Sequence, residues 1–112
     1  MKIDSRIDGK LTHLQVSGRI DASTSPSVDS AADAVFAGGG QNIIFDLQDV
    51  SYVSSAGLRA FVRAAKKAKA GGGGIAIFGL QANVAEIFAA AGFDKIIPIA
   101  ATEAQAHAKL GA

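Results

Sequence analysis

The chain contains no cysteine among its 112 residues. It therefore has no disulfide framework, no thiolate zinc site and no cysteine nucleophile, which excludes three common ways to build a small protein or an active site. A chain of this length can bury one hydrophobic core without a metal or disulfide to hold it together. We expect a single domain over residues 1–112.

An excess of one charge and long hydrophobic runs are also lacking. Eleven basic and ten acidic residues give a net charge of +1, so the composition does not indicate a nucleic-acid partner. The N-terminal MKIDSRID lacks the apolar run of a signal peptide, and no segment is apolar over the length of a membrane span. We expect a cytoplasmic protein with no direct membrane insertion.

Alternation of apolar and polar residues predicts two strands at the start of the chain, near residues 2–7 and 11–18. Asp8-Gly9 between them is typical of a hairpin turn, in which both turn residues must accept a positive φ. After the second strand, Thr24, Ser25 and Pro26 predict the start of a helix that three glycines end at residues 38–40.

The rest of the chain alternates short apolar strands with helices. Buried strands are predicted at residues 43–45, 75–78 and around 96–99, and helices at about 55–70, at 84–91 and from Thr102 onward. The helix at 55–70 has its apolar stripe at Leu58, Phe61, Val62 and Ala65. This order predicts an α/β fold, a mixed sheet with about four helices packed against it.

Most candidate chemical groups have a plain structural interpretation. His13 and His107 lie far apart in the sequence, and we expect them at an exposed strand position and a solvated helix position, with no metal site and no cofactor. Residues 71–74 follow a helix and open a strand, unlike a phosphate-binding loop. An acid after a buried strand, such as Asp46, could bind a metal or accept a phosphate as in a response-regulator receiver, but the acidic pair that a receiver has after its first strand is missing. We therefore expect Asp46 to bond backbone amides at the end of the strand.

Ser54 and Ser55 are the strongest candidates for a functional site. They follow a buried strand and a polar connection and open a helix, where backbone N–H groups lack partners and the helix dipole is positive. One of them is expected to cap the helix. The surrounding VSSAG is not a hydrolase nucleophile elbow, and no histidine base accompanies it, so we expect no enzymatic activity. Accepting a phosphate requires only an exposed hydroxyl, because a kinase supplies the base and metal.

Four segments give the chain a family resemblance across nearly its whole length. They are Gly18-Arg19-Ile20-Asp21-Ala22; Ile44-Phe45-Asp46-Leu47 with Val50-Ser51-Tyr52-Val53; Ser54-Ser55-Ala56-Gly57-Leu58; and Gly73-Gly74 before Ile75-Ala76-Ile77-Phe78-Gly79, with Val84 through Gly92-Phe93 beyond. In order and spacing the chain resembles STAS-domain proteins of the anti-sigma-factor antagonist type. The resemblance implies the STAS fold, a mixed sheet with helices.

The resemblance also implies a function in bacterial partner switching. An unphosphorylated antagonist binds an anti-sigma factor that is often also a serine kinase, which releases the sigma factor and allows transcription. Phosphorylation by the kinase releases the antagonist, and a serine phosphatase resets it. The match assigns Ser55 as the phosphate acceptor, with Ser54 as the runner-up, since Ser54 stands where the family usually has aspartate. It assigns partner binding to Asp21, Ser54, Ser55, Ala56, Gly57 and Arg59.

Other functions remain open at the level of sequence. A STAS regulatory subunit of a membrane transport complex would bind its partner without being phosphorylated, and the missing aspartate before Ser55 is compatible with it. A stressosome-like scaffold usually carries a further N-terminal domain. A small α/β enzyme or nucleotide-binding protein would be a different class, and ATP hydrolysis by the isolated protein would identify it.

Overall fold

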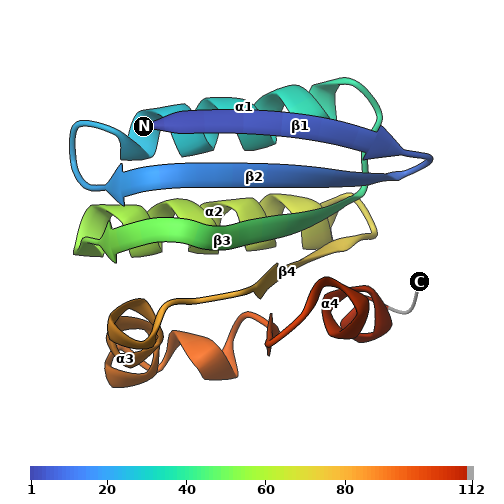
Figure 1. Cartoon of the computed structure of the whole chain (residues 1–112). Coiled ribbons are helices and arrows are strands. Elements are labelled where there is room, and N and C mark those ends of the chain that lie inside the picture. Colours follow the sequence, from blue (N-terminus) through green and yellow to red (C-terminus); the bar gives the residue numbers. More distant parts are fainter. Residues whose placement is uncertain (111–112) are drawn as a thin grey trace.

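The computed structural model describes residues 1–110. The elements follow in the order β1 (Lys2–Asp8), β2 (Leu11–Ile20), α1 (Ser25–Ala37), β3 (Asn42–Val53), α2 (Ser55–Ala70), β4 (Gly74–Phe78), α3 (Ala82–Ala90), the short 3-10 helix η1 (Phe93–Lys95), β5 (Ile99–Ala100) and α4 (Glu103–Lys109). One sheet has the strand order β1-β2-β3-β4-β5 (Figure 1). β1 is antiparallel to β2, and the other neighbours are parallel. The predicted mixed sheet with four helices is confirmed.

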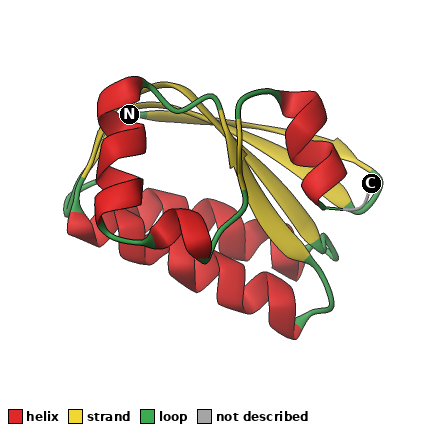
Figure 2. Ribbon diagram, turned by 90° about the horizontal axis from the view of Figure 1, so that it is seen from below, coloured by secondary structure: helices red, strands yellow, loops and turns green. Residues whose placement is uncertain are grey.

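The two faces of the sheet are covered unequally (Figure 2). On one face α1 and α2 lie side by side, and residues of α3 join the same core, in which Phe61 contacts Phe45 and Phe88. On the other face α4 covers a smaller cluster, formed by Leu11, Ile44, Ala76, Phe78, Ala100 and Ala106. No helix in residues 1–110 is both long enough and apolar enough to cross a lipid bilayer.

The first hairpin is present, but its turn lies one residue later than predicted. Asp8 pairs with Leu11, so the turn residues are Gly9 and Lys10. Of these two turn residues, only Gly9 has a positive φ, of 63°. A glycine at the first central position is the pattern of a type II′ turn, in which one residue needs a positive φ instead of two.

β3 is longer than predicted and continues through the expected polar connection to Val53. Its register against β2 shifts twice, between Gln15 and Ser17 and again between Gly18 and Arg19, so β3 carries extra residues at two bulges. At the first bulge Asp46 Oδ1 accepts a hydrogen bond from the Gln48 backbone N–H at 3.0 Å. Asp46 therefore bonds a backbone amide as expected, but within a continuing strand.

The helix α2 has the predicted bounds, and its buried face is wider than the predicted stripe. Leu58 and Phe61 are buried, whereas Val62 and Ala65 are only half-buried. The buried set also includes three alanines, Ala60, Ala64 and Ala68. The extra width arises because α2 packs against α1 as well as the sheet: Arg63 forms two hydrogen bonds with Asp29, and Lys67 pairs with Asp33.

Two predictions, the position of the last strand and the exposure of His13, are wrong, and His107 is less exposed than expected. Ile96 is 61% exposed and precedes the last strand, which contains only Ile99 and Ala100. His13 is buried and His107 is half-buried, and their ring centroids are 5.1 Å apart. Both rings lose contact with solvent because α4 packs against the start of β2, a contact between residues about ninety positions apart in the chain.

Candidate functional site at the carboxyl end of the sheet

The carboxyl ends of β2 and β3 lie at one edge of the sheet, where α2 begins (Figure 1). Ile20 pairs with Val53 in the ladder, and the Ser54 N–H donates a hydrogen bond of 2.8 Å to the Ile20 carbonyl oxygen. The turn that starts at Asp21 and the start of α2 are therefore neighbours. The structure brings Asp21 and the serine pair together, as the sequence motifs suggested.

Ser54 is the N-cap of α2, which confirms the prediction that one of the two serines caps this helix. Its backbone is extended, and its Oγ accepts a hydrogen bond from the Gly57 N–H at 3.2 Å. The Ser54 carbonyl accepts the first helical bond, from the Leu58 N–H. The hydroxyl is half-buried and satisfies one of the backbone donors that a helix start leaves unpaired.

Ser55 is the first residue of α2 and is exposed. Its hydroxyl makes no hydrogen bond with any residue in the described range 1–110. It stands at the positive end of the helix dipole, where backbone N–H groups favour an anion. The two adjacent serines thus differ in availability: one hydroxyl is used inside the fold and the other is free.

The next residues of α2 are shaped by close packing. Gly57 is buried against the end of β2: a Cβ at this position would lie 2.8 Å from Ile20 Cγ2, 2.9 Å from the Ile20 carbonyl oxygen and 2.9 Å from Val53 Cγ1. Ala56 is half-buried. Arg59 is exposed one turn after Ser55 and forms no ion pair within residues 1–110. Its charge remains available to a group bound at the helix start.

Asp21 holds the turn between β2 and α1. Its Oδ1 accepts hydrogen bonds from the Ser23 hydroxyl at 2.7 Å, the Ser23 N–H at 3.0 Å and the Thr24 N–H at 3.2 Å. The Ser23 hydroxyl, followed by the backbone N–H groups, lowers the pKa of the Asp21 carboxyl below its usual value. The other carboxylate oxygen makes no bond inside the described chain. An ionised Asp21 both orders the turn and presents an acceptor beside α2.

Sequence reasoning missed the polar residues that support this edge. Arg19 lies over the ring of Tyr52, 4.5 Å from its centroid, in a cation–π contact. β3 extends beyond its partner β4, and the first turn of α3 supplies donors to the overhang: Asn83 Nδ2 bonds the Ser51 carbonyl and Gln81 Nε2 bonds the Gln48 carbonyl, at 2.8 and 3.0 Å. No local motif marks these pairs, because they depend on strand register.

Neither histidine lies at this edge of the sheet. His13 precedes Ile20 by seven residues along β2, and His107 contacts His13. At about 3.3 Å per residue, His13 is on the order of 20 Å from the carboxyl end of β2. No imidazole is therefore close to Ser54 or Ser55.

Comparisons with known proteins agree with the fold and the motifs. A family model described as the STAS domain matches residues 2–106. An anti-sigma-B factor antagonist of Listeria monocytogenes is 34% identical over 90 residues, which are 80% of this chain and 79% of that protein. The relative is thus similar over most of both chains.

Solved structures share the fold at lower identity. An anti-sigma factor antagonist from Mycobacterium paratuberculosis superposes with a TM-score of 0.83 at 22% identity, covering 99% of this chain and 94% of that one. SpoIIAA in its unphosphorylated form gives 0.82 at 14% identity, with 99% and 98% covered. SpoIIAA from Bacillus in its phosphorylated form gives 0.72 at 15% identity, with 96% and 98% covered.

Proposed function

The chain belongs to the STAS-domain family, in its anti-sigma-factor antagonist branch, and on that premise we propose that it binds an anti-sigma factor through the surface around Ser55 and is released when Ser55 is phosphorylated. The observation that carries this proposal is the contrast between the two serines: Ser54 Oγ is bonded to the Gly57 N–H, whereas the Ser55 hydroxyl is exposed and unbonded. A kinase can reach Ser55 without dismantling the start of α2.

The missing aspartate has a physical substitute in this chain. Ser54 fills the N-cap position with an oxygen acceptor, and serine and aspartate are about equally good caps. What the substitution removes is a negative charge beside Ser55. A phosphate on Ser55 would therefore meet less repulsion here. A kinase that recognises the acid in other family members would have to recognise another group, and Asp21, in the turn beside the start of α2, is a candidate.

Electrostatics explains how a phosphate would work as a switch. It adds about −1.5 to −2 charges at neutral pH. At the start of α2, with Arg59 one turn further on, these charges are stabilised within the domain. In an interface built around a neutral hydroxyl they are costly, and a penalty of about 3 kcal/mol weakens binding more than a hundredfold. Release needs no large conformational change in the antagonist, which has no catalytic step of its own.

The test uses the cognate anti-sigma factor kinase, ATP and the purified protein. Intact-mass measurement should show one added phosphate, and peptide mapping should place it on Ser55. Ser55→Ala should bind normally and accept no phosphate, whereas Ser55→Asp should bind at least tenfold more weakly. Ser30→Asp, an exposed site on α1, is the matched charge control and should bind normally. Phosphate found only on Ser54 would overturn the assignment.

The same experiment separates the alternative function. A STAS regulatory subunit of a transport complex would bind its partner and accept no phosphate from a kinase, and its affinity would not respond to Ser55→Asp. The proposed cytoplasmic location and the serine phosphatase partner follow from the antagonist function and fall with it.

A further inference from the structure

Three metal-ligating side chains lie together on the face of the sheet that α4 covers. His13 comes from β2, and Glu103 and His107 come from α4, where a spacing of four residues puts them on the same side of the helix. One donor atom from each lies within 4.8 Å of the other two. The cluster is distant in sequence and in space from the serine pair.

His13 has an unsatisfied donor or acceptor inside this cluster. Its side chain is 9% exposed, and Nδ1 is buried without a hydrogen-bond partner, although Glu103 Oε1 lies 3.2 Å away. A buried polar atom without a partner is costly, so it usually marks a missing ligand or strain.

We propose that His13, Glu103 and His107 bind a divalent transition-metal ion such as Zn²⁺. Two imidazoles and one carboxylate are a common donor set for zinc, with water in the fourth position. Donor atoms around tetrahedral zinc lie about 3.3 Å apart, so no pair of donor atoms would have to close by more than roughly 1.5 Å. The exposed Glu103 carboxylate can make much of that movement.

The surroundings allow the ion to enter and leave room for a fourth ligand. A small cavity of about 160 Å³ opens beside His13 and Glu103 and is lined also by Gln15 and Asp46. Arg6 competes for the site, since its Nη2 lies 3.2 Å from Glu103 Oε1. The second oxygen, Glu103 Oε2, is in neither contact, so Arg6 can remain on one oxygen while the metal takes the other.

The site would fasten α4 to the sheet. α4 has seven residues, too few to be stable alone, and its apolar contacts come mainly from Ala106 and Leu110. A metal that binds only the folded arrangement stabilises it by mass action. The site rests on the fold and not on the proposed antagonist function.

The test is a titration of metal-stripped, tag-free protein with ZnCl₂. The chain has only two histidines and no cysteine, so background sites are few. We expect one ion per chain by calorimetry, a rise in Tm, and simultaneous shifts of both histidine ring signals by NMR. MgCl₂ should have no effect, because magnesium prefers oxygen ligands.

Variants decide whether the cluster holds the ion. His107→Gln and Glu103→Gln change partly exposed side chains and should weaken Zn²⁺ binding at least tenfold, while Glu86→Gln on α3 should leave it unchanged. His13→Gln should also abolish binding, and the other two variants keep the test valid if it folds poorly. Binding of equal strength in His107→Gln, or no binding below about 1 mM Zn²⁺, would overturn the proposal.

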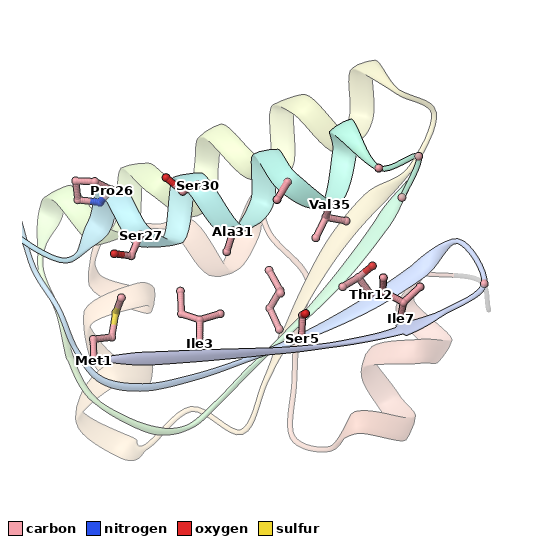
Figure 3. Close-up of a pocket in the computed structure, with 16 residues that line it drawn as sticks. Met1, Ile3, Ser5, Ile7, Thr12, Pro26, Ser27, Ser30, Ala31 and Val35 are labelled. Atoms are coloured by element: carbon pink, nitrogen blue, oxygen red, sulfur yellow. The ribbon is translucent and has the colours of Figure 1, made fainter.

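A second inference concerns the free edge of β1. β1 pairs only with β2, and beside it a groove of about 700 Å³ runs between β1 and α1 (Figure 3). Met1 and Ile7 line this groove and are 45% and 76% exposed. An exposed edge strand with apolar side chains is a template for pairing with another strand.

The sequence of β1, Lys-Ile-Asp-Ser-Arg-Ile-Asp, is complementary to itself about Ser5. In an antiparallel pair of two copies centred on Ser5, Lys2 faces Asp8, Ile3 faces Ile7 and Asp4 faces Arg6, and each pair occurs twice. Shifting the centre to Asp4 or Arg6 puts like charges opposite each other. We infer that a second copy of this chain pairs with β1 in the register centred on Ser5.

The backbone N–H and C=O groups that this register would pair are those that face away from β2. The two-residue turn makes Asp8 and Leu11 a hydrogen-bonded pair, and such pairs alternate along a hairpin. The N–H and C=O groups of Ile3, Ser5 and Ile7 therefore point to the free edge. In the proposed dimer they bond Ile7, Ser5 and Ile3 of the second copy, and the isoleucines cover each other above the groove.

Charge reversal tests the register. Sedimentation should give a dimer of the 11.3-kDa chain. Asp4→Arg alone and Arg6→Asp alone should each be monomeric, because residues 4 and 6 of the two copies then carry like charges. An equimolar mixture of the two variants should form a heterodimer, because each residue 4 then faces a residue 6 of opposite charge. A monomeric wild type, or a mixture that stays monomeric, would overturn the inference.

A cysteine cross-link gives an independent readout in a chain without native cysteine. Ser5 residues on the two-fold axis would have Cα atoms about 5.5 Å apart, within the range of a disulfide. Ser5→Cys should therefore form an oxidised dimer, and Ile7→Cys, four residues out of register with its copy, should not. Equal cross-linking of both variants would show random collision and reject the register.

Discussion

The two faces of the sheet differ in the side chains that pack on them. Under α1, α2 and α3, three phenylalanine rings pack together, with centroids 5.0 Å apart for Phe45 and Phe61 and 5.8 Å apart for Phe61 and Phe88. Under α4, half of the smaller buried cluster is alanine, and the polar side chains of His13 and Glu103 lie beside it, 3.2 Å apart. The proposed phosphorylation site lies at the start of α2, which packs against the first face because Gly57 lies close against Ile20.

This difference indicates where a change of surface charge would leave the domain stable and where the domain would open locally. A switch needs a rigid base, so that a phosphate alters a surface and not the stability of the domain. The start of α2 has such a base, because Leu58 and Phe61 of the same helix are buried in the larger core. The α4 face has little apolar packing of its own and is the place where local opening is expected.

The largest expected effect is loss of an aromatic ring from the first face. Phe61→Ala should lower the free energy of unfolding by about 3–5 kcal/mol, because it leaves a cavity between Phe45 and Phe88. Thermal or chemical denaturation measures this. Phe61→Leu, which keeps most of the volume, is the control and should cost less. An unchanged Tm for Phe61→Ala would show that Phe61 does not lie on the buried face of α2.

Gly57→Ala tests the close contact between the site and that core. Alanine has the better helix propensity, but its Cβ would come within 3 Å of the Ile20 carbonyl oxygen, a backbone atom that cannot turn aside. We expect a net loss of about 1–3 kcal/mol. Gly71→Ala, just past the end of α2, is the control, since its Cβ would lie 3.7 Å from its nearest neighbours. A stabilised Gly57→Ala would contradict the close packing.

The features that sequence predicted well are those with local causes. The bounds of α2 follow from a serine cap and a glycine stop, and the cap of α4 at Thr102 was predicted for the same reason. The features it missed are set by distant contacts. The polar residues after Phe45 look like a loop, but β2 pairs with them and makes them a strand. His13 looks exposed until α4 covers it.

The candidate site shows the same division. The motif around Ser54 and Ser55 predicts the start of a helix there, but adjacent residues with the same side chain cannot be told apart by type. Before the structure, only the family resemblance separates them. The structure adds that β3 ends at Val53, which makes Ser54 the cap and Ser55 the first helical residue. Arg19 and Tyr52 meet through the strand register, for which the sequence carries no local signal.

Two helix caps with hydrogen bonds of equal length allow a direct comparison of the faces. Ser54 Oγ and Thr102 Oγ1 each accept a backbone N–H at 3.2 Å, one on each side of the sheet. Ser54→Ala should cost about 1 kcal/mol of global stability, because α2 unfolds only with the core. Ser55→Ala is its control and should change stability by less than about 0.5 kcal/mol, as surface substitutions usually do. Equal losses of stability in Ser54→Ala and Ser55→Ala would show that the Ser54 hydroxyl does not cap α2.

Thr102→Ala should act locally instead. Amide exchange should accelerate by about fivefold at Gln105 and Ala106 for a cap worth about 1 kcal/mol. Exchange in β3 should be unchanged, because α4 opens without the larger core. If protection in β3 fell by the same factor, the two faces would unfold as one unit, and the contrast between them would not extend to stability.

The smallest expected effect concerns Asp21, whose carboxylate orders the turn beside the site. Hydrogen bonds from Ser23 and Thr24 favour the ionised form and lower its pKa. A lowered pKa in the folded state means that the contribution to stability is present above the unfolded value of about 3.9 and is lost as the pH falls through the folded value. Carboxyl NMR titration should give a midpoint for Asp21 below 3.9, and Ser23→Ala should raise it. An unshifted midpoint in the wild type would mean that these bonds do not hold the turn in solution, and the site would then have one ordered side, α2, where the structure has two.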